Sequence, residues 1–151
     1  MEKDIVAKWL KQYVGPDNFC EFFWGWYDFK DMKVVQNVGA VYGIWLKSVK
    51  TEIRKYEEEH HVSLKDFAGY RPLYWGKDVS PCSRISAHFD SSASTGALNL
   101  VYSNYASKDL IFGCVLTKEY TEIEKRLHKD YPPLEGSNRE GRSSTVRKIL
   151  K

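Results

Sequence analysis

The sequence predicts a single α+β domain over 1–151, with a small central antiparallel sheet flanked by helices. Short runs rich in Val, Ile, Tyr and Trp are typical of strands, and they alternate with charged segments whose apolar residues recur at helical spacing. Gly and Pro clusters separate these segments. The hydrophobic share of 42% is that of an ordinary globular protein, and the length suits one sizeable core better than two.

An N-terminal extension, helical and then aromatic, is expected over 1–33. Apolar residues at helical spacing predict a helix over 5–14, which Gly15-Pro16 would end. The next run, 19–29, is too aromatic for a clear periodicity and is expected to contain a strand. Its rings could stack on nucleic-acid bases, but burial against the core is the more common role.

A core is expected over 34–138, interrupted by an insertion at 47–70. The composition of 34–46 predicts a strand with a bend or close approach at Gly39. The insertion should hold a charged helix over 48–59 and one helical turn over 63–68.

The second half of the core begins with a short strand over 71–76. Ser80-Pro81 is a strong helix start, a serine N-cap before a proline, and predicts a helix to about Phe89. Residues 98–101 fit either a strand or a short helix. A buried strand over 109–116 and a last helix over 120–131, ended by Pro132-Pro133, complete the pattern.

Several classes of protein are disfavoured by composition. No apolar run approaches the roughly 20 residues that span a bilayer, and the first residues lack the features of a signal peptide. The three cysteines are far apart and form no CxxC, which argues against a disulfide framework or a zinc site. Glu57-Glu58-Glu59-His60-His61 is better explained as a solvated helix face than as a metal site, because neighbouring helical side chains point apart. An intracellular, cytoplasmic setting is therefore expected.

Positive charge gathers in a C-terminal tail over 139–151. The tail has five basic residues against the single acid Glu140, although the whole chain carries only +3. Such a tail is a plausible contact for nucleic-acid phosphates, and a solvated terminus is the plainer alternative. The residues expected to contact phosphates are Arg139, Arg142, Arg147 and Lys148.

The indication of a chemical function comes from two short motifs and from two residues that follow the second motif. The first motif is Gly39-Ala40-Val41-Tyr42, and the second is Tyr74-Trp75-Gly76. Arg84 follows Gly76 by eight positions, and His88 lies one helical turn later. Taken singly, strand tyrosines are usually core residues, and an arginine or histidine on an amphipathic helix is usually solvated. The joint pattern is what favours a functional site.

In this joint pattern, the chain resembles the GIY-YIG nucleases over about 38–138. Ala40 stands where the first half-motif has glycine, so Tyr42 matches better than its neighbours. The insertion between the half-motifs is similar to that of some restriction enzymes of the family. The resemblance implies a metal-binding glutamate on the last helix, for which Glu124 is the better match and Glu122 the competitor, and an asparagine, Asn138. Glu124 also follows Thr121 at capping-box spacing, a structural alternative.

The resemblance implies Mg²⁺-dependent hydrolysis of DNA phosphodiesters, with Mn²⁺ able to replace Mg²⁺. Arg84 would bind the scissile phosphate through its planar donor fork, and Glu124 would hold the metal. Tyr42 would be the general base, and the second half-motif would deliver Tyr74 to the same cleft. Because a free tyrosine has a pKa near ~10, Tyr42 would need positive charge nearby, from Lys77 or His88. His88 could instead be the base itself.

The implied function is that of a DNA endonuclease. Cutting both strands with one site per chain would favour a homodimer, as in restriction enzymes, whereas a monomeric repair or nicking enzyme is equally compatible with the residues. The runner-up is a catalytically degenerate module of the same kind, which binds nucleic acid or protein without cutting.

Overall fold

The computed structural model describes residues 4–15, 22–24, 39–78 and 109–135, and the backbone alone for 22–24. Within these residues it is a small α+β protein, as predicted. In chain order the elements are α1 (Ile5–Val14), β1 (Phe22–Trp24), β2 (Ala40–Lys47), α3 (Lys50–His60), the 3₁₀ turn η1 (Lys65–Phe67), β3 (Tyr70–Asp78), β4 (Leu110–Leu116) and α5 (Tyr120–Asp130).

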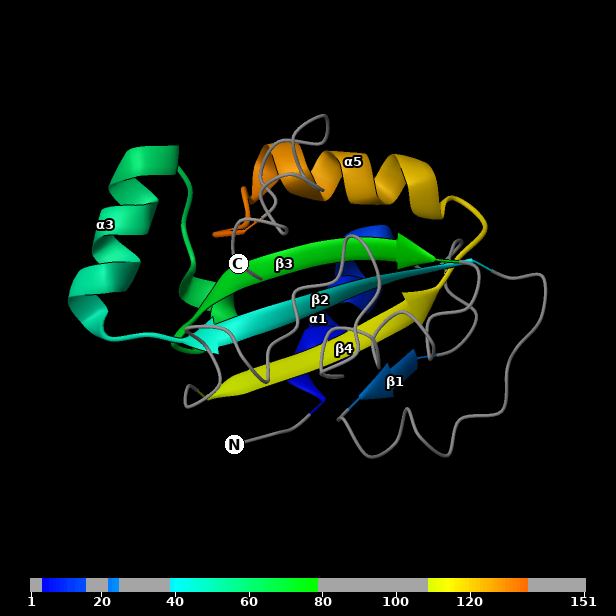
Figure 1. Ribbon diagram of the computed structural model, residues 1–151, viewed down its shortest axis with the longest axis horizontal. Helices are drawn as coiled ribbons and strands as arrows, with labels where there is room; N and C mark the ends of the chain where they lie inside the picture. Colours follow the sequence, from blue (N-terminus) through cyan, green and yellow to red (C-terminus); the bar gives the residue numbers. More distant parts are fainter. Residues whose placement is uncertain (1–3, 16–21, 25–38, 79–108, 136–151) are drawn as a thin grey trace, which may run out of the picture.

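The strands form one antiparallel sheet in the order β1-β4-β2-β3, so β2 lies in its centre (Figure 1). Every residue of β2 except Lys47 is buried. Both faces of β2 are therefore covered, which explains why its residues are apolar and β-branched in a nearly continuous run. The strand starts at Ala40, and residues 34–38 of the predicted strand lie outside the described residues. Part of the predicted aromatic strand is found as β1.

β3 runs from Tyr70 to Asp78, longer than the predicted 71–76. The pairing between β2 and β3 shifts register between Ile44 and Trp45, which pair with Tyr74 and Pro72. Leu73 is the extra residue of this irregularity. The shift lies next to Pro72, which has no backbone N–H to donate to the sheet.

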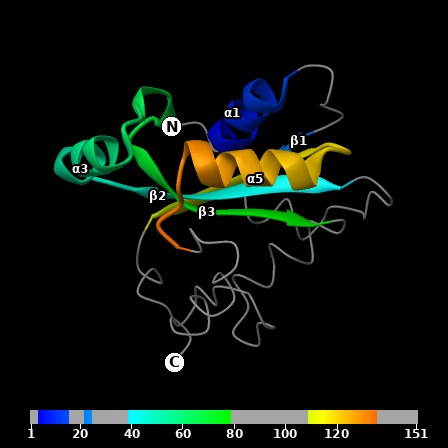
Figure 2. The same ribbon diagram turned by 90° about the horizontal axis from the view of Figure 1, so that it is seen from above.

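Helices α1 and α5 lie on one face of the sheet (Figure 2), which we call the helix-covered face. Val6, Leu10 and Val14 of α1 are buried in the same cluster as Trp45 and Trp75 of the sheet. Lys8 and Lys11 of α1 are exposed, as the helical spacing predicted. Gly113 of β4 allows the close approach of α1, because a Cβ there would lie 2.7 Å from the backbone nitrogen of Ala7.

The insertion between β2 and β3 contains α3 and η1 and extends beyond the end of the sheet (Figure 1). α3 begins after Val49, whose backbone N–H donates to Glu52 Oε1 at 3.0 Å. Its only buried residue is Tyr56. η1, in contrast, places Phe67 within the main core, where its ring stacks on Trp45 with centroids 4.2 Å apart.

The segment 131–135, which we call the strap, covers the outer edge of β3. The backbone N–H groups of Leu134 and Glu135 donate to the carbonyls of Pro72 and Leu73 at 3.0 and 2.9 Å. The Tyr56 hydroxyl donates to the Pro132 carbonyl at 2.7 Å, and Trp75 Nε1 donates to the Tyr131 carbonyl at 2.8 Å. The strap thus joins α3, β3 and α5, and it pairs with part of the outer edge of β3.

The helix predicted over 80–89, the element at 98–101 and the basic tail lie outside the described residues. In the part of the chain that is described, no helix has the length and apolar character needed to cross a bilayer.

Candidate nuclease site

Tyr42 and Tyr74 lie next to each other on adjacent strands. Their ring centroids are 6.1 Å apart and the rings are nearly parallel, at 28°. Tyr42 is opposite Gly76 in the register, and Tyr74 is opposite Ile44. The two half-motifs that the sequence separates by about thirty residues are therefore direct neighbours in the sheet.

The tyrosine pair faces away from the helix-covered face. A side chain on Gly43 would meet both Trp75 of β3 and Val6 of α1, so Gly43 and Trp75 face α1. Successive strand residues point to opposite faces, which directs Tyr42, Tyr74 and Gly76 to the other side. We call this side the tyrosine face.

Gly76 is required by packing and not by a turn. β3 continues through Gly76 to Asp78. Among the described glycines only Gly15 and Gly69 have positive φ, so Gly76 has no unusual backbone conformation. A Cβ on Gly76 would instead overlap the ring of Tyr42. The glycine of the second half-motif thus makes room for the tyrosine of the first.

Both tyrosines are buried: Tyr42 has no exposed surface and Tyr74 has 2%. A packed aromatic pair of this kind contributes about 0.5–1.5 kcal/mol to stability, in addition to the free energy of burying its surface area. A buried pair is also what an ordinary core contains. A phosphodiester could reach the hydroxyls only if this face opens in the complex.

Lys77 lies on the other side of β3 from the tyrosine pair. It is opposite Val41 in the register, and its Nζ lies 3.2 Å from Thr121 Oγ1 in the first turn of α5. The ammonium group therefore lies near the start of α5, next to the helix that carries Glu124.

Glu124 and His128 form a buried pair on α5. Glu124 has no exposed surface and His128 has 8%. His128 Nε2 lies 2.9 Å from Glu124 Oε1, one helical turn away. The contact is close, but its direction is not that of a hydrogen bond, and in the described part of the chain neither ring nitrogen of His128 has a hydrogen-bond partner.

The two glutamates proposed as metal ligands have different environments. Glu122 is exposed, whereas Glu124 faces inward. The capping-box alternative for Glu124 is wrong, because α5 begins at Tyr120 after the N-cap Glu119, and Thr121 is already inside the helix. The Glu119 N–H donates instead to Thr117 Oγ1 at 3.2 Å.

The donor chemistry at Glu124 fits a hard cation. Mg²⁺ prefers oxygen ligands, keeps several waters and is commonly held by one or two carboxylates. No group of three or more His, Cys, Asp and Glu side chains that could hold a metal occurs within the described ranges. Glu124 has no exposed surface, so a hydrated Mg²⁺ could reach its carboxylate only if the packing around α5 opens.

The other predicted site residues lie outside the described ranges: Arg84, His88, Asn138, Arg139, Arg142, Arg147 and Lys148. The structure therefore brings Tyr42 and Tyr74 together on one side of β3. It places Lys77 and Glu124 on the other side of β3, where α5 lies.

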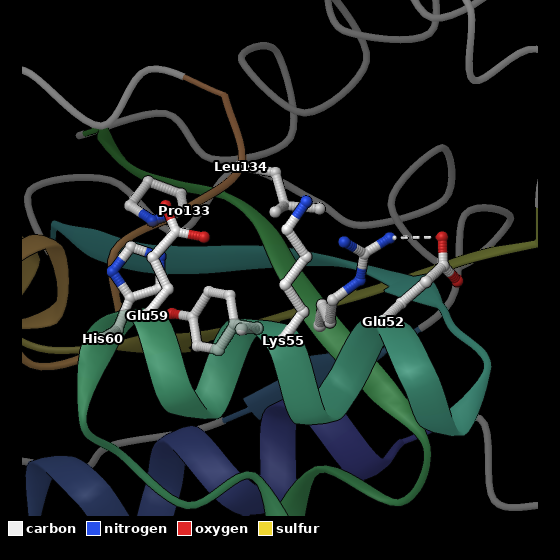
Figure 3. A pocket seen from close by; sticks show the side chains of 8 residues that line it. Glu52, Lys55, Glu59, His60, Pro133 and Leu134 are labelled. Atoms are coloured by element: carbon white, nitrogen blue, oxygen red, sulfur yellow. Dashed lines mark hydrogen bonds and ion pairs between the residues drawn. The ribbon is translucent and has the colours of Figure 1, made fainter.

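A pocket of about 300 Å³ lies elsewhere, between α3 and the strap (Figure 3). Its polar lining carries both signs of charge, which include those of Lys55 and Glu59. Arg71 donates to Ser48 Oγ at 2.7 Å and pairs with Glu52 at 3.2 Å. None of the predicted site residues that the structure describes lines this pocket, and its mixed charges favour neither an anion nor a cation.

Sequence reasoning missed His128. The available signal was its position four residues after Glu124, which places both side chains on one helix face. That spacing alone is common on helices, and the burial that distinguishes this pair is a property of the folded chain.

Comparison of the chain with protein-family models, with curated proteins and with solved structures found no match.

Proposed function

We propose that this protein is a Mg²⁺-dependent DNA endonuclease with a GIY-YIG-like core. The observation that carries the proposal is that the Tyr42 ring packs over Gly76 and lies next to the Tyr74 ring. It links the two half-motifs through a physical requirement, because the tyrosine of one needs the glycine of the other.

The arrangement of strands is compatible with this proposal. The first half-motif lies on the central strand β2 and the second on the edge strand β3, so the pair lies close to an edge of the sheet. Substrate is proposed to approach both sides of β3 from the end of that edge, beyond Pro72 and Leu73, to which the strap is bonded. The scissile phosphate is proposed to lie near the end of β3, between the tyrosine pair and the start of α5.

The proposed chemistry divides among four groups. Tyr42 accepts a proton from the attacking water, with His88 as the alternative base. Arg84 donates its guanidinium N–H groups to the phosphate oxygens that gain charge in the transition state. Glu124 holds the Mg²⁺, which when bound supplies Lewis-acid stabilisation of the phosphate and the leaving oxygen. Lys77 and the basic tail contribute positive charge toward DNA.

A non-catalytic binding module is the second candidate. The burial of Tyr42, Tyr74 and Glu124 favours it, because a group that works on DNA must be reached by DNA. In such a module these side chains would stabilise the fold, and the basic residues alone would bind the partner.

Plasmid cleavage with Mg²⁺ and with EDTA separates the two candidates. The wild type is expected to nick or linearise DNA only with Mg²⁺, and Arg84→Ala and Glu124→Ala are expected to lose at least about 100-fold in rate. Glu122→Ala is the matched control, because it removes an exposed carboxylate from the same helix.

Cleavage that persists in both variants would contradict the site assignment. A wild type that binds DNA but cuts neither duplex, branched nor single-stranded substrates would favour the binding module. Sedimentation of the DNA complex would show whether one chain or two acts on the duplex.

A further inference from the structure

We propose that the pocket between α3 and the strap binds a small zwitterion, a molecule of about the size of a dipeptide that carries one ammonium and one carboxylate group. Its carboxylate is held by Lys55 and its ammonium by Glu59. The site is independent of the proposed nuclease function, because none of the described nuclease residues lines this pocket.

The walls of the pocket are fixed before any ligand binds. The Tyr56 hydroxyl of α3 donates to the Pro132 carbonyl of the strap at 2.7 Å, and the Leu134 backbone N–H donates to the Pro72 carbonyl of β3 at 3.0 Å. These bonds hold α3 and the strap together, which lowers the entropic cost of ordering a binding site. The volume of about 300 Å³ is at the lower end of the range for small-molecule sites, so the ligand must be small.

Lys55 and Glu59 bring opposite charges to this pocket from positions one turn apart on α3. Figure 3 shows that both side chains extend from the helix toward the strap, Lys55 toward Leu134 and Glu59 toward Pro133. Within the described ranges neither of them forms a salt bridge. Lysine before glutamate is also the less favourable order for an ion pair at this spacing. One ammonium and one carboxylate therefore face the same pocket.

Arg71 adds hydrogen-bond donors to the pocket without changing this balance of charge. Its Nη2 pairs with Glu52 at 3.2 Å, so these two charges offset each other, and its Nε donates to Ser48 Oγ at 2.7 Å. The two contacts hold the guanidinium in place, and its side chain is only 16% exposed. Neither contact uses Nη1, whose N–H groups can donate to the carboxylate of a ligand.

A zwitterion suits this lining better than a ligand with a single charge. An anion would satisfy Lys55 and bring its charge close to the Glu59 carboxylate, and a cation would satisfy Glu59 and lie close to Lys55. A molecule with both charges meets an opposite charge at each end. The rings of Tyr56 and His60, whose centroids are 4.4 Å apart, and the side chains of Pro133 and Leu134 provide apolar surface for its middle part.

Titration of the isotope-labelled full chain with glycylglycine tests the proposal, with backbone amide shifts measured by NMR at low ionic strength. We expect saturable shifts in α3 and the strap. N-acetylglycylglycine lacks the ammonium group, and glycylglycinamide lacks the carboxylate. Each analogue should need a concentration about three- to fivefold higher for half-saturation, the effect of losing one solvent-exposed ion pair.

Two variants assign each charge of the ligand to its partner. Lys55→Gln should weaken glycylglycine by the same factor and leave glycylglycinamide unchanged, because that analogue has no carboxylate to lose. Glu59→Gln should weaken glycylglycine and leave N-acetylglycylglycine unchanged. Arg54→Gln and Glu58→Gln are the matched controls, since both residues are exposed on α3 and neither lines the pocket.

Three results would overturn the proposal. The first is the absence of saturable shifts in α3 and the strap when glycylglycine is added. The second is equal affinity for glycylglycine and either analogue, which would identify a site for a single charge. The third is that the control variants weaken glycylglycine as much as Lys55→Gln and Glu59→Gln do, because the effect would then come from the overall charge of α3. All four substitutions change exposed side chains, and the amide spectrum shows that each variant is folded.

Discussion

At the scale of single residues, the structure explains why the second half-motif ends in glycine. Gly76 lies in the middle of an extended strand, and what it lacks is a side chain in the space taken by the Tyr42 ring. This requirement could not be predicted from the sequence, because it depends on which residues pair across β2 and β3. The resemblance placed Tyr42 and Tyr74 in one compact unit, and the structure shows that their rings are neighbours.

Gly76→Ala should destabilise the protein by about 1–3 kcal/mol or more, because the added methyl group overlaps a buried ring. The free energy of unfolding is measured by urea denaturation followed by tryptophan fluorescence. A double-mutant cycle with Tyr42→Leu isolates the contact, since the alanine should cost less where the ring is absent. Equal costs in both backgrounds would show that the two residues do not pack as described.

At the scale of elements, the insertion divides into two parts with different roles. α3 has one buried residue, whereas η1 places Phe67 against Trp45 and Trp9 in the main core. The sequence predicted both pieces from their helical pattern. It could not show that the short turn, and not the longer helix, belongs to the core, because that depends on contacts with α1.

Phe67→Ala should therefore lower the free energy of unfolding by about 3–5 kcal/mol, the usual cost of removing a buried aromatic ring. Glu58→Ala in exposed α3 should change it by no more than about 0.5 kcal/mol. The two variants are compared by the same urea titration. Similar small effects would mean that the whole insertion is a peripheral attachment.

The strap gives the protein a specific sensitivity to alkaline pH. Burial, and then the charges of Tyr131 and Glu59, raise the pKa of the Tyr56 hydroxyl, which donates to the Pro132 carbonyl. In the unfolded chain a tyrosine ionises near pH ~10. The stabilisation is therefore complete below that pH, and it is lost as pH rises above ~10, because the unfolded state releases the proton first.

Tyr56→Phe is expected to lower the free energy of unfolding by about 0.5–1.5 kcal/mol at pH 8, through loss of the hydrogen bond. Its stability should then fall less steeply than that of the wild type between pH 10 and 11. Urea titrations at several pH values measure both effects. Parallel curves for the two proteins would show that Tyr56 does not contribute to the alkaline transition.

Most of the described helices and strands could be predicted from residue patterns in the sequence. Helical spacing predicted α1, α3 and α5 to within one or two residues, and β-branched and aromatic runs predicted β2, β3 and β4. The sheet order could not be predicted in this way, since it is fixed by contacts between distant segments. β3 is longer than predicted, because its pairing with β2 continues through Lys77 and Asp78.

At the scale of the whole molecule, the sheet separates the proposed site into two groups. The tyrosine pair lies on one face, and Lys77 and Glu124 lie with α5 on the other. The sequence predicted which residues belong together but not their distribution around β3. Under the proposed function, a phosphate beside the edge strand β3 would be reached by both groups.

The most direct test of this account is the single-turnover rate of DNA cleavage by Tyr42→Phe and Tyr74→Phe. Each change removes only a hydroxyl from a packed ring, so the free energy of unfolding should change by no more than about 1–2 kcal/mol. For Tyr42→Phe we expect the cleavage rate to fall about 10²–10⁴-fold, the usual contribution of a general base, and for Tyr74→Phe a smaller loss. Wild-type rates in both folded variants would contradict the claim that the tyrosine pair is the centre of a nuclease site.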